Sequence, residues 1–392
     1  MKNVYILGGA RTAIGSFQGA FATVPAAVLG ATAVKGALER SGVAGNPVDE
    51  ALLGCVLLGG QGQAPGRQAW IKAGLPDSVP CVTLAKVCGS GLRTVMMAAS
   101  QIKAGDSDLV VAGGMENMTM APYFIPKARA GLRMGNAEIV DLMVNDGLWD
   151  VYNNFHMGMA AEMCAEKFGI TRQMQDEFAI ASYTKALDSI KNGLFKREIV
   201  PVELPGRKGE TTLVLEDEEP FRSKLDKIPG LKPAFKKDGT VTAANASSIN
   251  DGAAAVVLAG EEKVKAVGLT PKFRVVGYAG HAQAPEWFTT APAFAIKKVL
   301  ERTGLSVNDI DVFEINEAFS VVSLAVNQLC ELDPAKVNVR GGAVALGHPI
   351  GASGTRILVT LMHVMEDTGA RRGLASLCIG GGEAVALIIE RV

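Results

Sequence analysis

The chain has 392 residues, of which 48% are hydrophobic and 20% charged, so it is too long for one ordinary domain and rich enough in apolar residues for a large core. Thirty-nine basic and forty acidic residues give a net charge of −1, which argues against general binding to nucleic acid or to a membrane surface. The longest uncharged stretch, 12–34, contains polar residues and a proline, so we expect no membrane span. Because the N-terminus runs directly into a strand-like segment, leaving no room for a signal peptide, we expect a cytoplasmic protein.

Six cysteines are scattered along the chain without a C-x-x-C pair or a regular spacing: Cys55, Cys81, Cys88, Cys164, Cys330 and Cys378. This distribution favours neither a disulfide framework nor a zinc site. Most of these thiols are therefore expected to be small buried hydrophobic groups, and any reactive one must be identified from its surroundings.

Two parts of the chain resemble each other at a nearly constant offset. The matched pairs are 33–43 with 295–305 (six identities in eleven positions), 48–49 with 310–311, 90–93 with 353–356, and 113–116 with 380–383. The offsets are 262, 262, 263 and 267 residues. Four matches in the same order indicate two copies of one α/β unit rather than a many-repeat solenoid.

Each copy is expected to contain a strand, an amphipathic helix, a strand, a second helix and a strand. The first copy places these elements at 4–7, 31–40, 51–58, 89–103 and 109–112. The second places them at 273–278, 293–302, 312–315, 351–365 and 375–379, the last of these taken as the final long strand. Short apolar runs that alternate with helices predict buried sheets flanked by helices.

Residues 119–249 have no counterpart in the second copy and carry more charge. An acidic run, 216–219, lies beside several basic residues between 222 and 237. Such a run is most often a solvated, loop-rich excursion. A lobe that covers a substrate and offers its cations to phosphate groups is the alternative, and the sequence leaves both open.

A cysteine stands directly before the second helix of the first copy, in Lys86-Val87-Cys88-Gly89-Ser90. A helix N-terminus stabilises negative charge, so this thiol is expected to ionise more easily than an ordinary one. The small residues after it allow a ligand to approach the backbone closely. A small apolar residue at a tight turn is the structural alternative.

The equivalent turn of the second copy carries a histidine, His348, between Gly347 and Pro349. A lone histidine is more often a hydrogen-bonded structural residue. The repeat favours a functional one here, because the two equivalent turns can face one cleft about a pseudo-twofold axis. Cys378 and Asn316 each end a predicted strand, where catalytic groups often emerge from α/β sheets, although asparagine is also common in turns.

These residues together indicate acyl transfer from a thioester. Activation of a cysteine by a histidine is the ordinary route to an acyl-thioester enzyme, and a second thiol is suited to moving a proton to or from carbon. Backbone amides beside the glycines can supply donors for a developing oxyanion.

The chain resembles the thiolases over essentially its whole length, and within them the acetyl-CoA acetyltransferase (acetoacetyl-CoA thiolase) group. The motifs that carry this resemblance are 87–91 (Val-Cys-Gly-Ser-Gly), 113–118 (Gly-Gly-Met-Glu-Asn-Met), 316–319 (Asn-Glu-Ala-Phe), 347–354 (with Gly-His-Pro and Gly-Ala-Ser-Gly) and 378–382 (Cys-Ile-Gly-Gly-Gly).

The resemblance implies a role for each residue of the predicted centre. Cys88 would be the acylated nucleophile, His348 its activating base, and Cys378 the group that handles the proton on the substrate α-carbon. Asn316 would position a water that forms one oxyanion hole with His348. The backbone N–H groups of Cys88 and Gly380 would form the other.

The resemblance also implies the fold and the assembly. We expect an α/β thiolase fold with two similar halves in a layered αβαβα arrangement and an inserted loop domain. The segments would be 1–118 with 250–270 for the N-terminal half, 119–249 for the loop domain that receives CoA and contributes to oligomer contacts, and 271–392 for the C-terminal half. Thiolases generally use no metal or redox cofactor. A homotetramer is expected, with a dimer as the alternative, and acetyl-CoA, acetoacetyl-CoA and CoA as substrates and products.

Weaker resemblances concern CoA and the acyl chain. His156 resembles the histidine that contacts the CoA arm near the acyl group, Ser247 the serine that binds pantetheine, and Arg222 a residue that meets the CoA phosphates. Leu148 and Phe288 are candidates for the wall of the acyl pocket. The segment 284–292 departs from the Met-Gly-x-Gly-Pro pattern common in the group, and a bulky Phe288 would change which branched or longer acyl chains fit.

Four other positions also differ from the usual residue: Ala85 and Arg340 stand in place of asparagine, and Ala244 and Ser248 in place of glycine. These differences bear on loop geometry and substrate fit rather than on the reaction class.

Three other functions are compatible with parts of this pattern. A 3-ketoacyl-CoA thiolase of broad chain length would use the same chemistry in a deeper pocket. A decarboxylating β-ketoacyl synthase would carry a second histidine where Asn316 stands. A non-catalytic thiolase-fold protein that binds acyl-CoA would be favoured by loss of Cys88 or His348, and both are present.

Overall fold

The computed structural model describes residues 2–43, 45–205 and 210–392. The strands of the body lie side by side in the order β14 (Val312–Ile315), β15 (Arg372–Ile379), β16 (Glu383–Arg391), β13 (Phe273–Ala282), β1 (Val4–Arg11), β12 (Asn250–Gly260), β5 (Leu109–Asn117), β3 (Glu50–Gly54) and β4 (Cys81–Leu84). The two central strands, β13 and β1, join two half-sheets through only two residue pairs. The order β14-β15-β16-β13 is therefore mirrored by β3-β5-β12-β1 about that junction.

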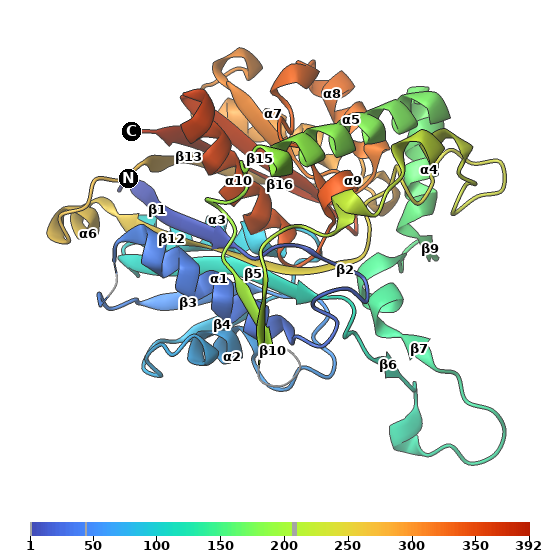
Figure 1. Ribbon diagram of the computed structural model, residues 1–392, viewed down its shortest axis with the longest axis horizontal. Coiled ribbons are helices and arrows are strands. Elements are labelled where there is room, and N and C mark those ends of the chain that lie inside the picture. The colour runs from blue at the N-terminus through green and yellow to red at the C-terminus, as the bar shows by residue number, and fades with distance from the viewer. Residues whose placement is uncertain (1, 44, 206–209) are drawn as a thin grey trace.

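Helices fill three layers around the two half-sheets (Figure 1). They are α1 (Ala26–Ser41) and α2 (Pro65–Lys72) on one outer face, α3 (Ser90–Ala104) and α10 (Ser353–Thr368) in the middle, and α7 (Ala291–Thr303) and α8 (Ser320–Cys330) on the other outer face. Along β5, Val110 and Ala112 face the middle layer while Leu109 and Val111 face α1, so both faces are buried. This is the layered αβαβα arrangement that the resemblance implies.

The register of the sheet tests the internal repeat residue by residue. Leu53 pairs with Gly113 in the first half, and Ile315 pairs with Ser376 in the second. Because Leu53 and Ile315 correspond at the 262-residue offset, Gly113 corresponds to Ser376. The predicted match of Gly113 with Gly380 is therefore wrong by four residues, whereas α3 and α10 begin at corresponding residues.

Several elements also differ from the expectation, and β1, β5 and β13 each end four or five residues later than predicted. The first helix begins at Ala26, directly after Pro25, rather than at residue 31. The strand expected at 51–58 ends at Gly54, and beyond Cys55 the backbone N–H groups of Val56 and Leu57 bind the buried carboxylate of Glu116 instead of a neighbouring strand. The strand that ends at Ile379 is not the last one, since β16 follows it.

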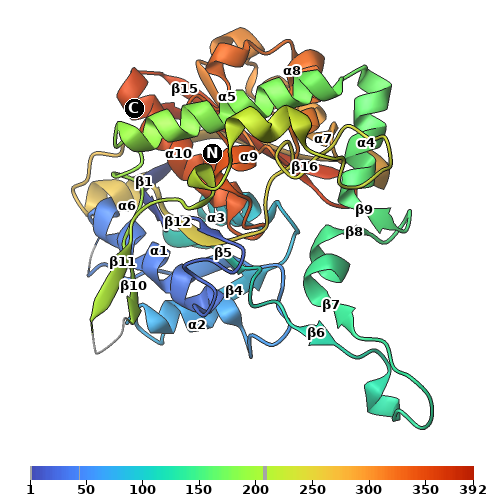
Figure 2. The same cartoon turned by 45° about the vertical axis from the view of Figure 1, so that its right-hand side comes forward.

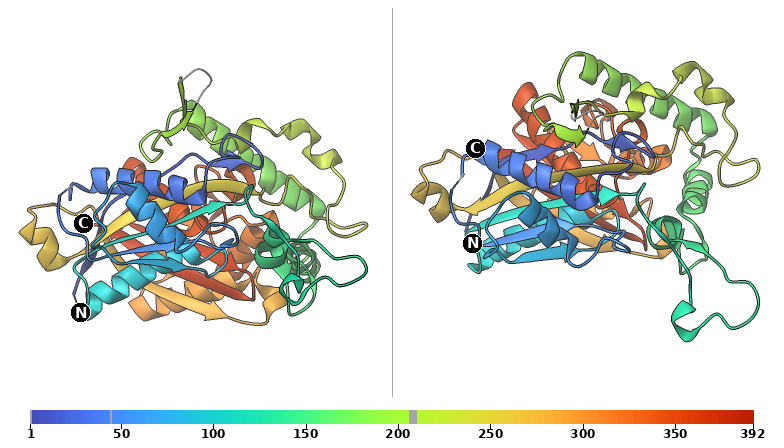
Figure 3. Two further views of the ribbon diagram at one scale, coloured as in Figure 1. Left: turned by 90° about the horizontal axis from the view of Figure 1, so that it is seen from below. Right: turned by 60° about the horizontal axis from the view of Figure 1, so that its bottom comes forward.

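The segment between β5 and β12 packs on the body and also projects from it. It contains β6 (Tyr123–Phe124), β7 (Val140–Asp141), β8 (Trp149–Asp150), β9 (Phe155–His156), α4 (Met157–Phe168), α5 (Arg172–Lys191), β10 (Val202–Pro205) and β11 (Thr211–Val214). The hairpin of β6 and β7 extends away from the body (Figures 2 and 3). In contrast, α5 lies against α8 and the short helix α9 (Ala343–Leu346), next to the turn that carries His348.

Candidate active site

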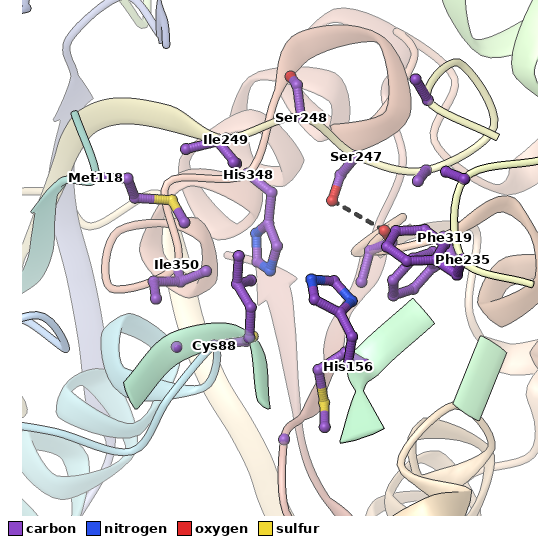
Figure 4. A pocket seen from close by; sticks show the side chains of 18 of the residues that line it. Cys88, Met118, His156, Phe235, Ser247, Ser248, Ile249, Phe319, His348 and Ile350 are labelled. Carbon is purple, nitrogen blue, oxygen red and sulfur yellow. Dashed lines mark hydrogen bonds between the residues drawn. The ribbon is translucent and has the colours of Figure 1, made fainter. Parts of the chain in front are cut away.

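A mainly apolar cavity of about 370 Å³ lies where the two equivalent turns meet. Seven residues expected at the site line it: Cys88, Leu148, His156, Ser247, Phe288, His348 and Gly380. The imidazole rings of His348 and His156 and the side chain of Cys88 face the same space (Figure 4). Such a concave, apolar site with a few convergent polar groups is typical of small-molecule binding.

Cys88 lies in the turn between β4 and α3, which a short network of hydrogen bonds holds. The Ser90 hydroxyl donates to the Val87 carbonyl at 2.7 Å and accepts from the Lys86 backbone N–H at 2.8 Å. Val87 has a φ of +45°, an uncommon conformation for a β-branched residue. Such local strain is concentrated at functional sites, and here it sets the direction of the cysteine that follows.

The expectation that Cys88 ionises easily is wrong for the free protein. Burial of the sulfur raises the pKa of the Cys88 thiol to about 12, although the residue as a whole is only half-buried. The backbone N–H groups of Gly380 and of Cys88 itself lower this pKa, but by less than burial raises it. The helix N-terminus is therefore outweighed by desolvation, and Cys88 rests as a thiol that needs a base.

His348 is buried and is held by one backbone and one side-chain hydrogen bond. Its backbone N–H donates to Asn250 Oδ1 at 2.9 Å, and its Nδ1 lies 2.6 Å from Ser353 Oγ. The Ser353 hydroxyl in turn donates to the Pro349 carbonyl at 2.9 Å. Burial, followed by the charge of Arg356, lowers the pKa of His348 to about 3, so the ring is neutral and can accept a proton.

Asn316 lies behind His348 rather than on the cavity wall. Its Nδ2 is 3.5 Å from each ring nitrogen of His348, too far for a strong hydrogen bond. Within the described residues, its buried Oδ1 has no hydrogen-bond partner. The Asn316 amide therefore lies next to the imidazole and can still form hydrogen bonds to a ligand.

Cys378 is fully buried near the end of β15 and does not line the cavity. Burial and the neighbouring Cys88 raise its pKa well above that of a free thiol. The effect of Cys88 on Cys378 indicates that the two sulfurs are neighbours, with Cys88 toward the cavity and Cys378 behind it.

Aromatic rings shape the side of the cavity that faces the inserted segment. The ring of His156 stacks on Phe235 at 4.7 Å between centroids, and its Nδ1 accepts the backbone N–H of Gly158 at 3.0 Å. Burial lowers the pKa of His156, so the neutral ring carries its proton on Nε2. Ser247 lies nearby and donates to the Ala318 carbonyl at 2.9 Å.

Phe288 and Leu148 line the same cavity, as expected for walls of an acyl pocket. The ring of Phe288 is 3% exposed and packs edge-on against Phe319 at 6.4 Å between centroids. Gln283 holds its segment by donating to the Trp287 carbonyl and to Thr290 Oγ1 at 2.9 Å. These contacts hold the ring of Phe288 in place at the cavity wall.

Arg222 is the one expected site residue that is neither at the cavity nor behind its wall. It is exposed and ends a short 3-10 helix, Glu219–Phe221. The structure therefore does not bring it together with Cys88 and His348.

The unusual Arg340 is buried and joins separate parts of the chain. It donates to the Leu194 carbonyl at 3.0 Å and pairs with Asp367 of α10. Ser248 donates to Asn250 Oδ1 at 2.8 Å, the same atom that holds the His348 backbone. Ala85 is exposed and Ala244 buried, and nothing in the structure explains these two differences.

Sequence reasoning missed two contributors to the site. Ser353 belongs to the glycine-rich motif 347–354, and its place five residues after His348, in the first turn of α10, is the signal that could have suggested the contact. Phe235 comes from a loop without any recognisable pattern, so no sequence signal identified it.

Two further properties concern the described part of the chain as a whole. Across residues 2–43, 45–205 and 210–392, no helix is long and apolar enough to cross a membrane. Over the same residues, no three His, Cys, Asp or Glu side chains are grouped so that they could hold a metal ion.

Comparison with known proteins shows the family to which the chain belongs. The family model of the thiolase N-terminal domain matches residues 4–262, and that of the thiolase C-terminal domain matches residues 269–391. Proteins named acetyl-CoA acetyltransferase from Cupriavidus necator and Pseudomonas aeruginosa are 54% and 52% identical over 392 residues, which covers 100% of both chains in each case. A crystal structure of the Bacillus anthracis acetyl-CoA acetyltransferase superposes with a TM-score of 0.97 at 43% identity, covering 100% of this chain and 99% of that one. The chain belongs to the thiolase family.

Proposed function

We propose that this thiolase is an acetyl-CoA C-acetyltransferase, which condenses two molecules of acetyl-CoA to acetoacetyl-CoA and CoA and also runs the reverse thiolysis. The observation that carries the proposal is the convergence of Cys88, His348 and the Gly380 backbone on one apolar cavity. The full-length identity to proteins named acetyl-CoA acetyltransferase supports this choice of substrate.

The first step transfers an acetyl group to Cys88. His348 Nε2 takes the thiol proton as Cys88 Sγ attacks the thioester carbonyl carbon of acetyl-CoA. The bond between this carbon and the CoA sulfur then breaks, and CoA leaves as a thiol with the proton of Cys378. The enzyme is left with acetyl-Cys88, a cationic His348 and a thiolate at Cys378, so charge is conserved.

The second step forms the carbon–carbon bond. The Cys378 thiolate removes an α-proton from a second acetyl-CoA, and the resulting carbanion attacks the acetyl carbon on Cys88. The bond to Cys88 Sγ breaks, and His348 returns its proton to that sulfur. Acylation prepares Cys378 for this task, because a neutral thioester at Cys88 cannot repel a thiolate and the cationic His348 attracts one.

Two sets of donors stabilise the oxyanions of these steps in this proposal. The backbone N–H groups of Cys88 and Gly380 already point at the Cys88 sulfur, and both lower its pKa. The Asn316 amide and His348 form the second set, at the distances given above. Loss of one donor of this kind costs about 10²–10³ in kcat.

The CoA arm would enter along the aromatic side of the cavity. His156 offers its Nε2 proton to the thioester oxygen or to a pantetheine carbonyl, and the Ser247 hydroxyl, whose proton goes to the Ala318 carbonyl, can accept a pantetheine N–H. Contact between Arg222 and the CoA phosphates stays a prediction. Phe288 and Phe319 limit the space for the acyl group, which favours acetyl over longer chains.

The test is CoA-dependent loss of three substrates: acetoacetyl-CoA, 2-methylacetoacetyl-CoA and a long-chain 3-ketoacyl-CoA. Cys88→Ala is the blank. A strong preference for acetoacetyl-CoA is expected, and a preference for the long chain would replace the proposal with a fatty-acid 3-ketoacyl-CoA thiolase. Turnover of none of them by folded protein would point to an acyl-CoA-binding protein.

The roles of the two thiols have a separate test. Cys378→Ala is expected to form acetyl-Cys88 from acetyl-CoA but not to make acetoacetyl-CoA. Full condensation activity in this variant would refute the role of Cys378.

We also propose a homotetramer. The projecting hairpin carries exposed apolar side chains, among them Tyr123 and Ile139, and such a surface is suited to contacts between subunits. Sedimentation of the purified chain would measure the assembly. The cytoplasmic location stays a prediction, which cell fractionation would check.

A further inference from the structure

Behind Asn316 and His348 lies the carboxylate of Glu317, which is 1% exposed and does not face the cavity. It accepts hydrogen bonds from Ser182 Oγ at 2.7 Å, Asn338 Nδ2 at 2.8 Å and the Val344 backbone N–H at 3.1 Å. The reaction outlined above makes no use of these groups. Removing any partner from this buried carboxylate is nevertheless costly, because a buried donor or acceptor without a hydrogen-bond partner has lost its bonds to water and gained none in return.

We propose that Ser182 and Glu317 are positioning residues that couple helix α5 of the inserted segment to both Asn316 and His348. This inference rests on the proposed function, since it assigns a purpose to the placement of those two side chains. It is based on the hydrogen bonds that connect Glu317 and Ser182 to the segment before Asn316 and to the helix before His348.

The contacts toward Asn316 run through Asn338. Asn338 Nδ2 donates to Glu317 and to the Ile315 carbonyl at 2.8 Å, while its Oδ1 accepts the Ile315 backbone N–H at 2.8 Å. The Asn338 side chain therefore binds both backbone groups of Ile315, the last residue of β14 and the residue directly before Asn316. The Asn316 backbone is also tied to the sheet through the Ser376 carbonyl at 3.0 Å.

The contacts toward His348 run through the short helix α9. Val344, which donates to Glu317, lies in this helix, and Gly347 and His348 follow its end. The backbone of Gly342 approaches so closely that an added Cβ would lie 2.2 Å from the Glu317 carboxyl carbon. The helix before His348 therefore rests directly on this carboxylate.

Ser182 brings the inserted segment into this arrangement. Its hydroxyl gives its single proton to Glu317 and accepts the Gly342 backbone N–H at 3.0 Å. It is 3% exposed and lies on α5, which packs along α9 (green and red-orange in Figure 1). If α5 shifts, then Glu317 and the start of α9 must shift with it, or one of the two hydrogen bonds of Ser182 must break.

Ser182→Ala is the variant that tests the inference, and Ser189→Ala is its matched control. Ser189 is also buried on α5, at 4% exposed, and its side chain makes no hydrogen bond among the described residues. We expect kcat for acetoacetyl-CoA thiolysis to fall about tenfold or more in Ser182→Ala, with KM changed by less than about twofold. Ser189→Ala is expected to match the wild type in kcat.

A double-mutant cycle with Glu317→Gln adds a test of the coupling. An amide at this position must present an N–H to Asn338 or to Ser182, which both donate, so the single variant loses at least one bond. If Ser182 acts through Glu317, the double variant is expected to lose less than the product of the two single losses. Strictly multiplicative losses would overturn the coupling.

Hydrogen exchange provides a readout that does not depend on activity. The backbone amides of Gly342 and Val344 are expected to exchange faster in Ser182→Ala than in Ser189→Ala. Equal kcat and equal exchange in the two variants would overturn the inference, whatever the substrate. A wild-type chain without thiolase turnover would instead refute the proposed function, and the exchange result would still report on the contacts.

Discussion

His348 Nδ1 and Ser353 Oγ lie 2.6 Å apart, and the serine's own proton is directed to the Pro349 carbonyl. Because a hydroxyl has one proton to give, the contact with the ring requires Nδ1–H to be the donor. The lone pair of the neutral imidazole is therefore on Nε2. This relationship determines which ring nitrogen takes the proton of Cys88.

Ser353→Ala is expected to slow acetylation of Cys88 by about 10- to 100-fold. The substitution leaves Nδ1–H buried without an acceptor, which costs about 1–3 kcal/mol and frees the other tautomer. Rapid-mixing measurement of CoA release from acetyl-CoA would give the rate. Ser323→Ala is the control, since this buried hydroxyl on α8 has no hydrogen-bond partner within the described residues. An unchanged acetylation rate in Ser353→Ala would show that the serine does not set the tautomer.

The pKa of about 12 for Cys88 predicts how its alkylation depends on pH. Below its pKa, the thiolate fraction rises about tenfold with each pH unit, so reaction with iodoacetamide should accelerate steadily from pH 6 to pH 10. A thiolate already paired with a cationic histidine would react at a nearly constant rate across this range. Mass spectrometry of the peptide that contains Cys88 would distinguish the two.

Phe288→Ala is expected to raise the turnover of 2-methylacetoacetyl-CoA relative to acetoacetyl-CoA by about tenfold. Removing the ring opens the cavity wall beside Phe319, and one methylene of acyl fit is worth about 1–3 kcal/mol. The ratio of the two kcat/KM values is the measurement. Phe294→Ala, which alters a ring that is 40% exposed on α7, should leave this ratio unchanged. A fall in both activities with the ratio unchanged would show that Phe288 supports the site without selecting the chain.

Arg340→Asn is expected to lower stability while leaving the reaction intact. The change removes the bond to the Leu194 carbonyl and the pairing with Asp367, and losing hydrogen bonds of a buried charged group costs about 1–3 kcal/mol. Arg197 also pairs with Asp367, which limits the loss toward the lower end. The melting temperature should fall by several degrees, with kcat within about twofold of wild type. A large loss of kcat at unchanged melting temperature would assign Arg340 to catalysis instead.

Much of the centre could be predicted from the sequence because its residues lie in short motifs at corresponding points of a repeat. Cys88 and His348 were placed in equivalent turns, and both turns do face one cavity. The layered fold followed from the family that those motifs indicate. Carried through the sheet register, the 262-residue offset of the first two matches gives 263 residues between Gly113 and Ser376, the same offset at which α3 and α10 begin.

Other features depend on tertiary contacts that no local pattern contains. The rise in the Cys88 pKa comes from burial of the sulfur, whereas the sequence showed only the neighbouring helix N-terminus. Strand pairing stops one residue after Gly54 because Glu116, 62 residues from Gly54 in the chain, takes the backbone N–H groups of Val56 and Leu57. The exposed position of Arg222 depends on how the inserted segment folds back on the body.

The correspondence between α3 and α10 has a consequence for how this centre tolerates change. At their 263-residue offset, Cys88 corresponds to Gly351 and His348 to Ala85. The backbone is thus nearly twofold symmetric, but the reactive side chains are not. One turn carries the thiol of Cys88 and the other carries the imidazole of His348. A damaged turn therefore has no substitute in its counterpart, because the symmetry of the backbone does not extend to the reactive side chains.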